Sequence, residues 1–352
     1  MPTDWGWIVQ RPHFLALELG KYYDVKVVYL KQYIKRWKSQ KNILPPANSK
    51  YGLYLPRQEK ISLFRKISEV TLKKAMGDIN GYDAVVIGTP MMYSFIENYR
   101  GKVIYDCMDN YVALTEDESM KKEVELCENQ LIERSDLILV SSKKLADFVY
   151  GRRKEANVVL VRNGYNNKNT YEIKKEETRE QYHLGYIGTI SSWFNFKMLH
   201  RCVSEITNVM FHLLGPAMGY EAEAEDRIVL EGVIEHEALY DKIQNYDCLI
   251  MPFVLNDIIL AVDPVKLYEY ISFGKCIISI YYDEIARFED FVYFYHDDNE
   301  FVELVENLGK KGFPAKYNKA QQREFLESNS WEVRGKLVDE SIKHFWDKTR
   351  SN

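Results

Sequence analysis

The chain has 352 residues, of which 46% are hydrophobic and 28% charged, and this length and composition predict a globular protein of two domains. Its formal net charge of −5 argues against nucleic-acid binding, and no apolar run reaches the length of a transmembrane helix. The five cysteines lack C-x-x-C spacing and no signal-peptide pattern opens the sequence, so we expect a cytoplasmic protein with free thiols.

The first half of the sequence alternates short β-rich runs with stretches of helical periodicity. The strand-like runs are residues 25–30, 84–88, 102–106, 137–141 and 158–161, and residues 119–134 and 143–150 have helical spacing. This alternation predicts a parallel sheet covered by helices, in a first domain of residues 1–170. A polar segment without apolar periodicity, residues 166–181, then predicts a linker.

The second half repeats the pattern. Its strand-like runs are residues 184–188, 210–215, 228–232, 248–252 and 276–279. We therefore expect a second Rossmann-like α/β domain over residues 182–328. Ser330 is a suitable N-cap, so residues 329–352 predict a final helix.

Residues 263–279 carry the most informative local pattern. Pro264 suits the first turn of a helix, and Gly274 suits a left-handed helix end before an apolar strand. Lys266 and Glu269 are three residues apart, so both side chains lie on one face of this helix. A cation, a carboxylate and exposed helix amides suit a phosphate and a ribose, although an ordinary surface ion pair fits the same spacing.

Three other segments place polar residues at predicted loops or strand ends. The opening Asp4-Trp5-Gly6-Trp7-Ile8-Val9-Gln10-Arg11-Pro12-His13 precedes a predicted helix, and its aromatic and basic groups suit sugar or phosphate contacts. Residues 105–111 put Asp109 at the carboxyl end of a strand, where α/β folds bind ligands, although a turn role also fits. Residues 186–193 read as a strand, a glycine turn and a helix start, without the G-x-G-x-x-G dinucleotide fingerprint.

These segments resemble the motifs of bacterial GT-B glycosyltransferases of the family-4-like group, which make capsule, O-antigen and teichuronic acid. Residues 263–279 are similar to the family's P-x-K-x-Y-E-Y donor motif, and residues 4–13 to its D-W-x-W-x-Q-R-P opening. The resemblance implies GT-B architecture: two Rossmann-like parallel-sheet domains facing a cleft, the acceptor side first and the nucleotide-sugar side second. It also implies that the helix of residues 329–352 crosses back to the first domain.

The resemblance further implies a glycosyltransferase that moves a sugar from a nucleoside-diphosphate sugar, most often a UDP-sugar, to a hydroxyl of a surface polysaccharide or lipid-linked saccharide. No cofactor or metal is expected beside this donor. In the family, the residue matching Glu269 binds the ribose and the one matching Lys266 lies close to the diphosphate. The other implied contacts are Gly188, Thr189, Val233, Ile234 and Leu267 for the donor, Trp7, Arg11, His13 and Asp109 for the acceptor, and Asp109, Lys266 and Asp263 for catalysis.

Two departures from the family pattern leave alternatives open. Ala261 stands where relatives have a glutamate near the transferred sugar, and residues 188–195 lack the family's basic residues. We expect a metal-independent, retaining transferase, with Asp109 as general base if the reaction inverts instead. A non-catalytic homologue that is the partner of another transferase and a nucleotide-sugar epimerase on the same fold are the alternatives.

Two basic stretches, residues 31–41 and 60–76, interleave lysine and arginine with aromatic and apolar residues. Such stretches suit an anionic membrane surface, so we predict peripheral contact with the inner face of the cell membrane. A solvated helix face is the alternative.

Overall fold

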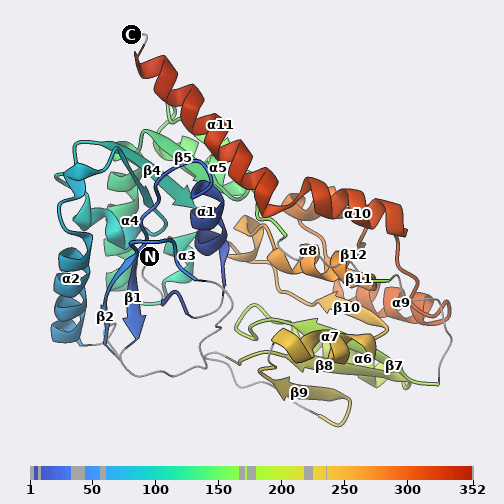
Figure 1. The fold of residues 1–352 in the computed structure, drawn as a ribbon. Helices are drawn as coiled ribbons and strands as arrows, with labels where there is room; N and C mark the ends of the chain where they lie inside the picture. Colours follow the sequence, from blue (N-terminus) through green and yellow to red (C-terminus); the bar gives the residue numbers. More distant parts are fainter. Residues whose placement is uncertain are drawn as a thin grey trace. The chain divides into compact units, whose positions relative to one another are not determined.

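The computed structural model describes residues 4–6, 9–32, 44–55, 61–165, 171–172, 180–217, 225–234 and 236–350. The chain forms two compact units: unit 1 comprises Met1–Gly164 and Trp331–Asn352, and unit 2 comprises Tyr165–Ser330. Each unit has its own parallel sheet, flanked by helices (Figure 1). Unit 2 is therefore inserted in the sequence between the main part of unit 1 and its final helix.

Unit 1 is built on a four-stranded parallel sheet of order β3-β4-β5-β6, with β1 and β2 forming a separate parallel pair. Strands β4 and β5 are buried almost throughout, because their continuous apolar runs are covered on both faces. The strands are β1 (Val28–Gln32), β2 (Lys50–Tyr54), β3 (Ala84–Ile87), β4 (Lys102–Cys107), β5 (Leu137–Val140) and β6 (Val158–Leu160). The helices are α1 (Arg11–Leu19), α2 (Ser62–Met76), α3 (Tyr111–Leu114), α4 (Glu118–Arg134), α5 (Lys143–Arg152) and α11 (Trp331–Arg350).

Helix α11 completes the core of unit 1. Its Trp331, Val338 and Ile342 are buried in one cluster with Leu15 and Leu19 of α1. The ring of Trp331 also stacks on a phenylalanine of α1, with centroids 5.0 Å apart. The final helix thus packs on the first sheet domain, as the resemblance implied.

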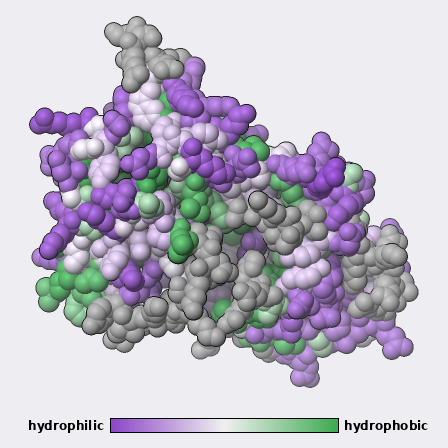
Figure 2. Space-filling model, viewed as in Figure 1, coloured by the Kyte–Doolittle hydropathy of each residue, from purple (hydrophilic) through white to green (hydrophobic). Residues whose placement is uncertain are grey.

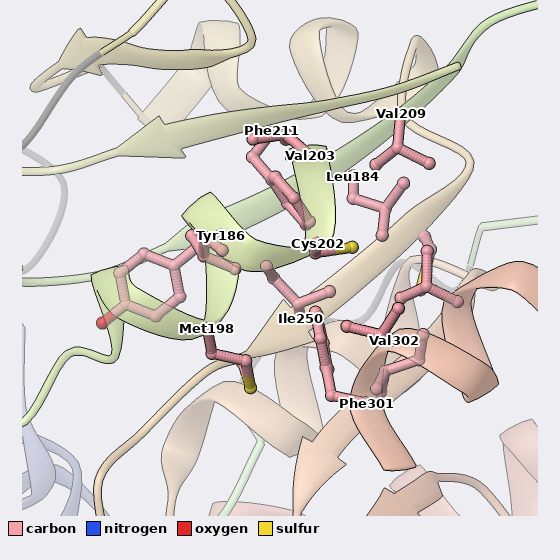
Figure 3. Close-up of a cluster of buried hydrophobic side chains, with 14 of the residues drawn as sticks. Leu184, Tyr186, Met198, Cys202, Val203, Val209, Phe211, Ile250, Phe301 and Val302 are labelled. Carbon is pink, nitrogen blue, oxygen red and sulfur yellow. The ribbon is translucent and has the colours of Figure 1, made fainter. Parts of the chain in front are cut away.

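Unit 2 is built on a six-stranded parallel sheet of order β12-β11-β10-β7-β8-β9. Its strands are β7 (Tyr182–Ile187), β8 (Val209–Leu214), β9 (Ile228–Gly232), β10 (Cys248–Met251), β11 (Cys276–Ile280) and β12 (Tyr293–Tyr295). Its helices are α6 (Phe196–Glu205), α7 (His236–Gln244), α8 (Val265–Ser272), α9 (Asp298–Gly309) and α10 (Lys319–Ser328). Figure 3 shows one of its cores, in which side chains of β7, β8 and β10 meet those of α6 and α9.

The predicted fold class is confirmed, because two parallel α/β sheets form where the sequence predicted them. Every strand-like run predicted from the sequence overlaps an observed strand, but the prediction missed β2 and β12. Residues 33–41 and 60 of the two basic stretches, and most of the predicted linker, lie outside the described residues. Among the helices that the structure describes, none is both long and apolar enough to cross a bilayer.

Candidate functional site

The loop that follows β7 packs tightly against the loop that follows β8. The amide of Gly188 donates to the Leu214 carbonyl at 2.8 Å, and the Tyr186 hydroxyl donates to the Thr189 carbonyl at 2.8 Å. Gly215 has a φ of +142°, and a Cβ there would lie 1.9 Å from the Gly188 carbonyl oxygen. Only glycine fits this close approach, so the backbone around Gly188 and Thr189 has one defined position.

Helix α8 begins beside this loop without a side-chain cap. Its N-cap residue is Pro264, which makes no side-chain capping hydrogen bond, so no cap covers the amides of Val265 and Lys266 at the helix start. Lys266 Nζ donates to Glu269 Oε2 at 2.8 Å, and these side chains are 34% and 30% exposed. An uncapped helix start with a solvent-accessible cation and carboxylate can bind an anion and a diol together.

Tyr270 connects α8 to the loop after β7. Its buried hydroxyl accepts a hydrogen bond at 2.9 Å from the amide of Ile187, the residue before Gly188. Lys266, Glu269 and Tyr270 recur at helical spacing and share a face of α8. This hydrogen bond therefore links the end of β7, directly before Gly188, to the helix that carries Lys266 and Glu269. In the sequence Tyr270 fits only an apolar position of this helix, although a phenol within a buried apolar run needs a hydrogen-bond partner.

Asp263 anchors the start of α8 from below the surface. Its carboxylate has no exposed area, accepts from the Tyr268 hydroxyl at 3.1 Å and forms an ion pair with Arg287, which lies in the 3₁₀ helix Asp283–Phe288. Both carboxylate oxygens are engaged by these two side chains. The predicted catalytic role of Asp263 therefore needs correction: its burial and its two partners make it a structural anchor.

The far end of α8 is anchored as firmly as its start. The Ile271 carbonyl accepts from the Tyr317 hydroxyl at 3.0 Å and from Gln322 Nε2 at 2.7 Å. Both donors are buried, which strengthens these bonds and rigidifies the helix. These contacts hold α8, and with it the backbone of Lys266 and Glu269, in a fixed position.

The other predicted donor contacts differ in their exposure to solvent. Val233 and Ile234 follow β9, and Val233 is 73% exposed, so this segment is open to a ligand. Leu267, by contrast, is fully buried, and its amide already donates to the Pro264 carbonyl at 3.1 Å. We therefore correct the role of Leu267 from a donor contact to a packing residue.

In unit 1, Asp109 lies just beyond the carboxyl end of β4. Burial raises the pKa of Asp109 to about 7; the nearby Arg11 partly opposes the shift and Asp106 adds to it. The neighbouring Asn110 caps α3, because its side chain accepts from the Ala113 amide at 3.1 Å. The turn role thus belongs to Asn110, and within the described part of the chain no hydrogen bond occupies the Asp109 carboxyl group.

Arg11 and His13 serve the fold of unit 1. The buried guanidinium of Arg11 lies 2.7 Å from an Asp106 carboxylate oxygen and donates to the Val161 carbonyl at 2.6 Å, so it joins α1, β4 and the end of β6. The His13 ring accepts from the Gln10 amide at 3.2 Å, and burial lowers its pKa. Their predicted acceptor contacts therefore need correction, because neither side chain is exposed.

Trp7, the remaining predicted acceptor contact, lies outside the described residues. Within the residues that the structure does describe, no three His, Cys, Asp or Glu side chains gather into a set that could hold a metal ion. The structure therefore leaves two candidate sites, each within one unit: the Gly188 loop with the face of α8 in unit 2, and Asp109 in unit 1.

No family model matches the sequence. Among individual proteins, the chain is 25% identical over 289 residues to TuaH of Bacillus subtilis (strain 168), which is named as a teichuronic acid biosynthesis glycosyltransferase. The alignment covers 75% of this chain and 72% of TuaH.

Solved structures resemble the chain over nearly its whole length. Sucrose-phosphate synthase from Thermosynechococcus elongatus matches with a TM-score of 0.70 and 13% identity, covering 95% of this chain and 92% of the synthase. HepE of Anabaena, solved in complex with UDP and glucose, matches with a TM-score of 0.68 and 12% identity over 97% of this chain and 98% of HepE. The lipopolysaccharide outer core galactosyltransferase WaaB matches with a TM-score of 0.64 and 13% identity over the same shares. The expected GT-B fold is confirmed.

Proposed function

We propose that this chain, a relative of the bacterial GT-B glycosyltransferases, moves a sugar from a nucleoside-diphosphate sugar to a saccharide hydroxyl. The observation that carries the proposal is the uncapped start of α8, with Lys266 and Glu269 beside the Gly188 loop. Helix amides and a cation suit the diphosphate, and a carboxylate accepts hydrogen bonds from the two ribose hydroxyls.

The donor reorganises the Lys266–Glu269 pair. In its absence the two side chains neutralise each other at 2.8 Å. A bound diphosphate draws Lys266 away, which frees Glu269 for the ribose. Negative charge builds on the leaving diphosphate as the glycosidic bond breaks, so Lys266 and the amides stabilise the transition state most. The exposed segment at Val233 and Ile234 is then available for the base. HepE is solved with UDP, which supports a UDP-sugar as donor.

We assign to Asp109 the contact with the acceptor hydroxyl. A carboxyl group whose pKa is about 7 exchanges protons readily at neutral pH, which suits a general base or a hydrogen-bonding partner for a sugar hydroxyl. TuaH is named for teichuronic acid and WaaB for the lipopolysaccharide outer core, so the acceptor class is a surface polysaccharide or lipid-linked saccharide.

Transfer without a metal and with retention of the anomeric configuration is the course that the resemblance predicts. Lys266 and the α8 amides supply the positive charge that a metal would otherwise bring to the diphosphate. Proton NMR of the first product formed, in buffer containing EDTA, tests both points. An α-linked product from an α-linked donor supports retention, and a reaction that EDTA abolishes contradicts metal independence.

The donor site is tested by nucleotide binding to wild type and Glu269→Ala. UDP, GDP, dTDP and CMP are compared by thermal shift and calorimetry, because a ligand at 100 times its Kd stabilises the folded state by about 2.7 kcal/mol. Glu306→Ala on α9 is the matched control, since Glu306 pairs with Lys310 at the same 2.8 Å. We expect one nucleotide to bind wild type and the control but not Glu269→Ala.

The remaining outcomes identify the alternatives. Absence of binding by every nucleotide would contradict the donor site and favour a non-catalytic partner of another transferase. Conversion of the nucleotide-sugar without any acceptor would favour an epimerase. Equal weakening by Glu269→Ala and Glu306→Ala would mean that the ribose is bound elsewhere.

We also infer that unit 1 rests on the inner face of the cell membrane through α2. The helix turns Leu63, Ile67 and Val70 outward, and they are 61%, 39% and 67% exposed. Exposed lysines flank them at positions 66, 73 and 74. Figure 2 shows hydrophobic surface at the lower left, where Figure 1 places α2. Apolar and basic groups on one face suit anionic lipid.

Flotation with vesicles tests this contact. We expect binding to vesicles that contain anionic lipid, weaker binding to neutral vesicles, and loss of binding when Leu63, Ile67 and Val70 are all replaced by glutamine. Leu126→Gln is the control, because Leu126 on α4 is 60% exposed outside this face. Binding that survives the triple replacement would refute the assignment of α2.

A further inference from the structure

The ladder between β7 and β10 opens before the two strands end. Its registered pairs are Leu184 with Cys248 and Gly185 with Leu249. The next β7 residue that faces β10 is Ile187, because alternate residues of a strand direct their peptide groups to the same side. The amide of Ile187 does not complete the ladder but donates at 2.9 Å to a side-chain hydroxyl, that of Tyr270.

The Tyr270 hydroxyl is inserted between the two strands. It lies 3.5 Å from the carbonyl oxygens of both Ile187 and Ile250, so its proton reaches either strand. The Tyr270 side chain is completely buried, which makes these bonds costly to lose. A side chain from α8 thus replaces a backbone bond at the carboxyl edge of the sheet, where α/β folds bind ligands.

This insertion fixes two parts of the donor site against each other. Ile187 directly precedes Gly188 and Thr189 in the loop after β7, and Tyr270 shares its face of α8 with Lys266 and Glu269. The loop cannot move along the sheet without breaking the hydroxyl bond, and α8 cannot turn without pulling on the loop. The Tyr270 hydroxyl therefore links the Gly188 loop directly to the face of α8 that carries Lys266.

We propose that Tyr270 is a positioning residue: its hydroxyl holds the Gly188 loop and the face of α8 at the separation that a diphosphate requires. The inference rests on the proposed donor site. The Tyr270 hydroxyl aligns two contacts on one leaving group. Loss of this alignment should therefore destabilise the transition state more than the bound donor, because charge develops on the diphosphate during transfer.

Tyr270→Phe tests the inference, with Tyr295→Phe as the matched control. Tyr295 is also a buried tyrosine of unit 2, and its hydroxyl donates to the Met251 carbonyl at 3.4 Å. Three quantities are compared in the full-length protein: hydrogen exchange of the peptide that covers residues 186–192, the Kd of UDP, and kcat and KM for transfer.

We expect Tyr270→Phe to speed exchange in residues 186–192 and to weaken UDP binding by up to about tenfold, since one lost hydrogen bond is worth that much. We expect kcat to fall more than the KM of the donor rises. Tyr295→Phe should leave exchange at 186–192, the Kd of UDP and the kcat-to-KM split at wild-type values.

Two results would overturn the inference: unchanged exchange at 186–192 in Tyr270→Phe, or faster exchange there with wild-type Kd and kcat. Absence of UDP binding by wild type would instead refute the proposed donor. In that case GDP, dTDP and CMP take the place of UDP in the comparison, and failure of all four overturns this inference with the donor site.

Discussion

Replacement of Asp109 by asparagine should stabilise the protein above neutral pH. Burial raises the pKa of Asp109 from its ordinary value of 3.8 to about 7. The unfolded chain therefore loses this proton near pH 4 and the folded chain near pH 7, so wild type loses stability as the pH rises through this window. Each pH unit inside the window corresponds to about 1.4 kcal/mol. Because asparagine does not titrate, the stability gap between Asp109→Asn and wild type should grow by about 2 kcal/mol from pH 5 to pH 7, where the folded carboxyl group is half ionised.

Thermal melts of both proteins at pH 5, 7 and 8.5 measure this gap, with urea unfolding as a second readout. Above about pH 8 the gap should stay constant, because both states of wild type are then ionised. Asn110→Ala is the control: it removes the α3 cap and should cost about 1 kcal/mol equally at every pH. A gap for Asp109→Asn that does not change with pH would refute the reasoning, since it would mean that the buried carboxyl group has an ordinary pKa. The same variant should lose glycosyl transfer.

Three further substitutions have defined expected outcomes. Asp106→Asn leaves the buried Arg11 without its anion and should lower the free energy of unfolding of unit 1 by about 3–5 kcal/mol in urea titrations. Gly215→Ala places a Cβ against the neighbouring loop at a φ of +142°, so it should abolish nucleotide binding in calorimetry, whereas Gly151→Ala, which meets no atom within 4 Å, should bind normally. Arg287→Met removes the cation that pairs with the buried aspartate just before α8, so it should lower the melting temperature of unit 2. Replacing that aspartate by asparagine in the same variant should partly restore the melting temperature.

The fully buried strands leave the plainest pattern in the sequence. Strands β5, β10 and β11 are buried at every position, so continuous apolar runs marked them. Strand β2 was missed because it is half exposed and contains a glycine and a lysine, and β12 because it has only three residues. Short or edge strands depend on their neighbours for stability, and the local sequence carries little of that information.

Some features of the candidate site also follow from local sequence, whereas others depend on residues far apart in the chain. The pairing of Lys266 with Glu269 follows from spacing along one helix, and local sequence contains it. The ion pair of Arg11 with Asp106 joins positions 95 residues apart, so nothing local distinguished a buried clamp from an exposed ligand contact. The spacing of Tyr270 fits the apolar face of its helix. Its role as a hydrogen-bond donor and acceptor depends on Ile187, which lies at the end of β7 and far away in the sequence.

The contribution of α11 to unit 1 has a consequence for synthesis on the ribosome. The side chains of Leu15 and Leu19 are buried only when Trp331, Val338 and Ile342 pack on them, and these residues are translated more than 300 residues later. Unit 2 lies entirely between them and can fold first, so the usual order of N-terminal before C-terminal folding is reversed. During that interval the nascent unit 1 exposes an unfinished core, so we expect it to depend on chaperones. Shortening α11 should then lower the yield of folded protein by damaging the opposite end of the chain.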